Sequence, residues 1–115
     1  MNIEIPREYL VLLNQIFEIE RKLTKITQEH SINRNIERMK DVFAEIGLYY
    51  EDPIGQPYSD TRTDCDASIA GASTENLVIT EVLKPIIRFK KEGFTRILQR
   101  AVVIVESKLK ENSNG

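Results

Sequence analysis

Residues 47–58 read GLYYEDPIGQPY, and the hydrophobic periodicity of the chain changes at this stretch. Before it, apolar residues recur at intervals of three and four, which is typical of amphipathic helices. After it, they alternate or cluster in short runs, which is typical of strands. Gly47, Pro53 and Pro57 are turn-forming residues that separate the two patterns. The sequence therefore predicts an α+β fold in which a helical half precedes a β half.

Composition limits what the protein does. The 115 residues suffice for one domain, or for one small domain with an appendage. A net charge of -2 argues against nucleic acid as the main partner, because phosphate binding needs a basic excess. The sequence printed here has no apolar run long enough for a membrane span, and no secretory leader is expected. Its one cysteine, Cys65, has no internal disulfide partner. We expect a cytoplasmic protein without a membrane partner.

Two helices are predicted before residue 47, at about 7–29 and about 33–46. The second begins where the apolar seam changes phase, so Ser31 or Asn33 is expected to cap it, and Gly47 is expected to end it. The predicted seam residues are also the predicted dimerisation residues: Tyr9, Leu12, Leu13, Ile16, Ile19, Leu23, Ile36, Met39 and Phe43.

A single helical pair buries little apolar surface. Two pairs from two copies of the chain would make a four-helix bundle with a substantial core, so a homodimer is expected. In the alternative arrangement, the first helix packs on the β half of its own chain. The pattern alone leaves both arrangements open.

The β half is predicted to contain several short strands. These are expected at 67–70, 77–83, 86–89, 94–99 and 101–105, the last buried on both faces. Pro85 is expected to interrupt the strand pattern, and residues 90–93 are expected to form a four-residue hairpin turn. The predicted domain organisation is a helical dimerisation region at 1–47, a β-wing domain at 48–106 and a flexible tail at 107–115.

Four segments, which follow one another along the chain as they do in the GrpE family, resemble that family, the nucleotide exchange factors of DnaK-type chaperones. Residues 52–58, DPIGQPY, resemble the family's Asp-Pro-x-Gly-x-Pro-Phe, and residues 79–83, ITEVL, resemble its Val-x-Glu-Val-Leu. Residues 96–105, RILQRAVVIV, are similar to its closing Arg-Val-Leu-Arg-Pro-Ala-x-Val-x-Val strand, and residues 12–23, LLNQIFEIERKL, to its bundle helix. The resemblance is to a short, divergent member without the family's long N-terminal stalk helix.

The resemblance implies a co-chaperone that binds a DnaK-type ATPase through a β wing and promotes nucleotide release. Basic residues crowd the predicted hairpin, where they serve either as a protected strand edge or as a partner-binding face. The resemblance favours the second role, and the expected contact residues are Lys84, Arg88, Phe94, Arg96, Leu98 and Arg100. The alternative function is a dimeric interaction scaffold with the same fold and no exchange activity.

No catalytic constellation or cofactor site is predicted. Asp60, Asp64 and Asp66 carry oxygen ligands suited to hard metal ions, but their spacing is not that of an EF-hand, so turn residues are expected instead. Cys65 is expected to be a small buried residue, because the only histidine, His30, lies at the predicted helical break. The sequence thus predicts neither an enzyme nor a metal site.

Overall fold

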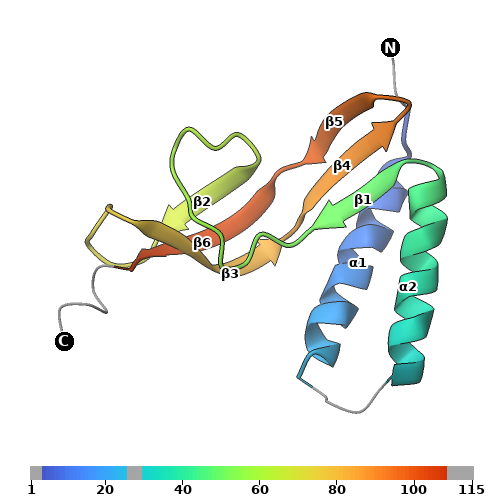
Figure 1. Cartoon of the computed structure of the whole chain (residues 1–115), viewed down its shortest axis with the longest axis horizontal. Coiled ribbons are helices and arrows are strands. Elements are labelled where there is room, and N and C mark those ends of the chain that lie inside the picture. The colour runs from blue at the N-terminus through green and yellow to red at the C-terminus, as the bar shows by residue number, and fades with distance from the viewer. Residues whose placement is uncertain (1–3, 26–29, 109–115) are drawn as a thin grey trace. The chain divides into compact units, whose positions relative to one another are not determined.

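The computed structural model describes residues 4–25 and 30–108, with side chains from 32 onward in the second range. Within these residues the chain forms two helices and six strands (Figure 1). The helices are α1 (Arg7–Leu23) and α2 (His30–Glu45), and the strands are β1 (Leu48–Glu51), β2 (Cys65–Ile69), β3 (Leu77–Lys84), β4 (Ile86–Lys91), β5 (Phe94–Gln99) and β6 (Ala101–Ser107). The predicted α+β class is confirmed.

The strands form two three-stranded sheets, with orders β1-β4-β5 and β2-β6-β3. Single residues connect the two sheets: Pro85 separates β3 from β4, and Arg100 separates β5 from β6. The Gln99 side-chain amide donates to the Pro85 carbonyl over 2.9 Å. The predicted interruption at Pro85 is confirmed.

The chain divides into two compact units. The first, called the helical unit below, comprises Met1–Tyr50 and Arg88–Arg96; the second, called the sheet unit, comprises Glu51–Ile87 and Ile97–Gly115. The tip of the β4–β5 hairpin therefore groups with the helices, and each unit has its own buried residues.

In the helical unit, α1 and α2 form an antiparallel hairpin (Figure 1). Leu13, Ile16 and Phe17 of α1 and Ile36 of α2 are buried, and Tyr9 packs edge-on against Phe43 with ring centroids 6.1 Å apart. Their spacing is that of one apolar face on each helix, as the periodicity predicts.

The predicted boundaries at the inner ends of the helices need correction. Described α1 ends at Leu23, where Thr24 Oγ1 donates to the Arg21 carbonyl over 2.7 Å, and residues 26–29 lie outside the described chain. Because α2 already begins at His30, Ser31 and Asn33 lie inside the helix and neither is its N-cap. Local capping preference misplaced this start, since polar residues are tolerated within a first helical turn.

Gly47 ends α2 as predicted. Its N–H donates to the Ala44 carbonyl over 2.9 Å, and its φ of +90° is one that side-chain-bearing residues rarely adopt. Strand β1, which was not predicted, starts at the next residue with the buried Leu48. The Lys90 N–H donates to the Gly47 carbonyl over 2.8 Å and joins the end of the helix to β4.

In the sheet unit, β6 is the central strand. It pairs in parallel with β2, with Cys65 opposite Ala101, and antiparallel with β3, with Ile79 opposite Val105. Alternate residues of β6 are buried, and Val102 and Ile104 between them are half-buried. The expectation that this strand is buried on both faces is therefore wrong, because a single sheet in a unit this small has only one fully covered face.

The hairpin between β4 and β5 also differs from the prediction. The connection has two residues, Glu92 and Gly93, rather than four, and both have positive φ, of 53° and 80°. Positive φ at both central positions is the signature of a type I′ turn, whose twist matches that of paired strands. Lys90 and Lys91 consequently belong to β4.

Candidate functional site

Two surfaces of the helical unit carry many of the predicted interaction residues: the exposed side of the helices and the tip of the β4–β5 hairpin. The helices expose an unusual number of large apolar side chains. In α1 these are Tyr9, Val11, Leu12 and Ile19, and in α2 they are Ile32, Met39 and Val42, followed by Ile46 just after the helix. Leu12 is 52% exposed and Val42 is 53% exposed.

The exposed apolar residues follow heptad spacing. Leu12 and Ile19 of α1 are seven residues apart, as are Ile32 and Met39 of α2. Residues at this spacing lie on one face of a helix, which is the arrangement of a coiled-coil seam. Each helix thus has an exposed apolar stripe beside its buried face.

The structure divides the predicted dimerisation residues into two groups. Leu13, Ile16 and Ile36 are buried within the chain itself, and Leu23 and Phe43 are half-buried. Tyr9, Leu12, Ile19 and Met39 remain exposed. Only the exposed group is a clean probe of association, because a charge placed at Ile16 would disrupt the core of one chain.

The hairpin tip, residues 88–96, is strongly cationic. It holds four basic side chains and one acidic side chain in a protein whose net charge is negative. A two-residue turn places Phe89 opposite Arg96 and Lys91 opposite Phe94, so these four side chains share one face of the hairpin. The rings of Phe89 and Phe94 contact each other accordingly, with centroids 6.0 Å apart.

Phe89 is buried and Phe94 is half-buried, whereas Lys91 and Arg96 are exposed. The hairpin face defined by Lys91, Phe94 and Arg96 therefore has an aromatic centre between two cations. Arg88 and Lys90 alternate to the opposite face, where the Lys90 ammonium lies 5.4 Å from the Tyr49 ring centroid. Arg88 therefore does not share the face of Arg96.

The other predicted contact residues belong to the sheet unit. Lys84 is exposed at the end of β3, and Leu98 and Ile97 are both half-buried. Both residues belong to β5, which is an edge strand. The Arg100 guanidinium donates to the Cys65 carbonyl over 3.0 Å and pairs with Asp66 over 2.9 Å.

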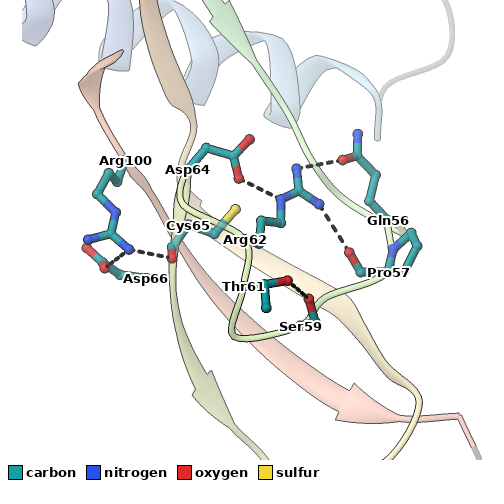
Figure 2. Close-up of polar contacts among 9 residues, drawn as sticks. All are labelled: Gln56, Pro57, Ser59, Thr61, Arg62, Asp64, Cys65, Asp66 and Arg100. Atoms are coloured by element: carbon teal, nitrogen blue, oxygen red, sulfur yellow. Dashed lines mark hydrogen bonds and ion pairs between the residues drawn. The ribbon is translucent and has the colours of Figure 1, made fainter. Parts of the chain in front are cut away.

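Sequence reasoning missed a polar cluster in the sheet unit, centred on Arg62 (Figure 2). Arg62 Nε donates to Asp64 Oδ1 over 2.6 Å, and its two terminal nitrogens donate to the Pro57 carbonyl over 3.1 Å and to Gln56 Oε1 over 2.8 Å. The adjacent carboxylate raises the pKa of the Arg62 guanidinium. The cluster folds the 56–64 segment back on itself, and no sequence periodicity marks it.

The three aspartates considered as metal ligands have different surroundings. Asp64 and Asp66 are paired with Arg62 and Arg100 respectively, and Asp60 is exposed. Residues 4–25 and 30–108 contain no group of three His, Cys, Asp or Glu side chains placed to hold a metal ion. Neither described helix has the length and apolarity that a membrane span requires.

Cys65 is buried, as predicted, with 1% of its surface exposed. Burial raises the pKa of its thiol, because the thiolate would lose hydration. The thiolate is the reactive form of cysteine, so Cys65 is poorly suited to nucleophilic chemistry at neutral pH. The side chain of His30 lies outside the described residues.

Comparison with known proteins found no family model, no curated protein and no solved structure that matches this chain. The candidate function consequently depends on the residues and geometry described above.

Proposed function

We propose that this chain is a GrpE-like co-chaperone that forms a homodimer through its helices. In the cytoplasm it would bind a DnaK-type ATPase through its β wing and promote nucleotide release. The observation that carries the proposal is the hairpin face of Lys91, Phe94 and Arg96, which follows a helical hairpin and precedes a closing β strand similar to that of the family. Aromatic residues and arginine are enriched at protein-binding surfaces, which supports Phe94 and Arg96 as the anchor of this face.

The proposed dimer is supported by the two exposed apolar stripes. In a monomer, Leu12, Ile19, Met39 and Val42 would remain in contact with water. Association of two helical hairpins would bury them in a four-helix bundle. The heptad spacing within each stripe supports this arrangement, since it keeps the same side chains facing a partner helix along its length.

The proposed mechanism needs no chemistry on this chain. Nucleotide release follows if the wing binds an open form of the ATPase cleft more tightly than the closed form, because the population then shifts towards the open form. The same coupling requires bound nucleotide to weaken binding of the wing by an equal factor.

Binding of the chain to a DnaK-type ATPase, measured with and without ADP, tests the proposal. We expect binding that ADP weakens and that Arg96→Glu weakens further at low salt. The second candidate is a dimeric scaffold that keeps the fold without exchange activity and binds another protein through the same wing; it is favoured if the ATPase does not bind, or if binding is insensitive to ADP. Absence of binding would contradict the co-chaperone function.

A further inference from the structure

Strand β2 is an edge strand whose outer side is open. It lies at one end of the order β2-β6-β3, and its only strand partner in the described chain is β6. The opposite edge of the same sheet is covered. There Gly55 N donates to the Ile79 carbonyl over 2.8 Å, Ile79 N to the Gln56 carbonyl over 2.9 Å, and Tyr58 N to the Leu77 carbonyl over 2.9 Å. Residues 55–58 therefore cover the β3 edge of this sheet, whereas no strand covers the β2 edge in the described chain.

Backbone alternation identifies the groups that β2 presents outward. Ala101 N donates to the Asp64 carbonyl and Ala70 N donates to the Val105 carbonyl, each over 2.9 Å, so even-numbered residues here bond towards β6. In a parallel pair the residues between them direct both N–H and C=O away from that partner. Cys65, Ala67 and Ile69 therefore face the open side.

The carbonyl of Cys65, the first of these three residues, already accepts a hydrogen bond. The Arg100 guanidinium donates to the Cys65 carbonyl and to the Asp66 carboxylate (Figure 2). This contact occupies the outward carbonyl at the start of β2. The outward N–H and C=O groups of Ala67 and Ile69 remain, and they can pair with about three residues of an added strand.

The side chains along this edge lack the usual protection against strand addition. Proteins block exposed edges with lysine, proline or bulges. The β4–β5 hairpin has Lys90 and Lys91, whereas β2 reads CDASI and is followed by small residues. Its one charged side chain, Asp66, is paired with Arg100. Ile69 is 46% exposed.

A groove of about 640 Å³ lies on the face of the sheet to which Ala67 and Ile69 point. Its apolar lining includes Pro57, Tyr58 and Leu77, and Asp60 is its only charged lining residue. Asp60 has no ion-pair partner within the part of the chain that the structure describes. A strand added beside β2 would place alternate side chains next to Ala67 and Ile69, at this groove.

We propose that the outer edge of β2 is a docking site for an extended peptide segment of a partner protein, which adds as a fourth strand. Main-chain bonds to Ala67 and Ile69 supply the attachment, and the groove selects the side chains. The segment carries a branched aliphatic residue facing Ala67 and Ile69, and a lysine or arginine two positions away on the same face to meet Asp60. The site lies wholly in the sheet unit and is independent of the proposed ATPase contact.

The probe is a fluorescein-labelled peptide, Gly-Thr-Val-Thr-Lys-Thr-Gly, whose valine and lysine share one face when extended. Fluorescence anisotropy with the full chain is expected to show saturable binding. The same peptide with its five central amides N-methylated loses the main-chain donors and should bind at least tenfold more weakly. A peptide with glutamate in place of lysine should also bind more weakly.

Variants of the chain test the site itself. Ile69→Lys should weaken probe binding at least tenfold, whereas the matched control Leu83→Lys, which changes an exposed aliphatic residue of β3 (44% exposed), should not. Ala67→Pro removes an outward N–H and should weaken probe binding as Ile69→Lys does. If the Ala67→Pro variant does not fold, the comparison of Ile69→Lys with Leu83→Lys and the N-methylated peptide still test the proposal. Asp60→Lys should reverse the preference between the lysine and glutamate probes.

Three results would overturn the proposal. The first is no saturable binding at millimolar probe. The second is equal binding of the methylated and unmethylated peptides. The third is a change in the oligomeric state of the probe-free chain caused by Ile69→Lys and not by Leu83→Lys, which would show that the edge pairs with a second copy instead.

Discussion

Gly47 and Phe89 are packed so closely that a Cβ atom on Gly47 would lie 2.9 Å from Phe89 Cε1. The same Cβ would lie 3.1 Å from the Lys90 carbonyl oxygen. The end of α2 is thus held against β4 at a residue that has no side chain, within the helical unit. The glycine satisfies two demands at once, because its φ of +90° and the close approach of the ring each disfavour any larger residue.

These two demands are separable by experiment. Gly71 has nearly the same φ, +89°, but nothing lies within 4 Å of its hypothetical Cβ. Gly71→Ala should therefore cost only the conformational strain, about 1 kcal/mol of unfolding free energy. Gly47→Ala should cost about 2 kcal/mol or more, because the aromatic ring must also move. Urea denaturation of both variants measures the difference, and equal costs would show that the contact with Phe89 contributes nothing.

The Arg62 cluster should not tolerate lysine. Arg62 makes three directed hydrogen bonds to Asp64, Pro57 and Gln56, and a lysine ammonium lacks the planar geometry to replace them. We expect Arg62→Lys to lower the unfolding free energy by about 1–3 kcal/mol. Arg34→Lys, at an exposed position of α2, is the matched control and should change it by less than about 0.5 kcal/mol. Similar effects of the two variants would argue against the cluster as a stabilising unit.

The buried thiol of Cys65 predicts a pH dependence of stability. Its pKa is raised above the ordinary value of 9.0 in the folded chain, so the folded state holds its proton more tightly than the unfolded state does. The associated stability is complete below pH 9 and is lost as the pH rises from there towards the folded pKa. The loss is at most about 1.4 kcal/mol per pH unit in that interval.

Comparison with Cys65→Ala isolates this contribution from other groups that titrate at alkaline pH. Denaturation midpoints measured from pH 7 to 10.5 should fall more steeply for the wild type than for the variant. Parallel curves would mean that the thiol has the same pKa in both states.

The exposed apolar stripes predict a dimer that surface substitutions dissociate. Leu12→Glu or Met39→Glu should leave the chain folded, because both residues are exposed within it, and should shift it from dimer to monomer by placing a charge in the bundle. Lys22→Glu, at an exposed polar position of α1, is the control and should remain dimeric. Sedimentation equilibrium at micromolar concentration measures all three, and a monomeric wild type would contradict the dimer.

Much of the fold was predictable because it depends on local signals. Gly47 ends a helix by its own conformational preference, Pro85 lacks the N–H that an unbroken strand needs, and β3 and β6 are rich in β-branched residues. Each of these features depends on a single residue or on a short run of residues. The predicted bounds of β3 accordingly differ from the observed ones by one residue.

The rest depends on contacts between distant or aperiodic residues. The Tyr50 hydroxyl donates to the Glu20 carboxylate, thirty residues away, and Lys40 lies 5.0 Å from the Tyr50 ring centroid. No spacing pattern in the sequence predicts a contact between residues so far apart. The partners of Arg62 are likewise set by the path of a loop. At the hairpin, the turn has two residues instead of the predicted four, so Phe94 lies opposite Lys91 rather than opposite Phe89.

The central claim is that the hairpin face of Lys91, Phe94 and Arg96 promotes nucleotide release from a DnaK-type ATPase. The most direct test is the release rate of a fluorescent ADP from that ATPase, followed by stopped flow at low salt with wild type, Arg96→Glu or Lys22→Glu. We predict that wild type and Lys22→Glu accelerate release equally. Arg96→Glu should need at least about tenfold more protein for the same rate, which corresponds to about 1.4 kcal/mol of lost binding. No acceleration by the wild type, or full acceleration by Arg96→Glu, would contradict the account.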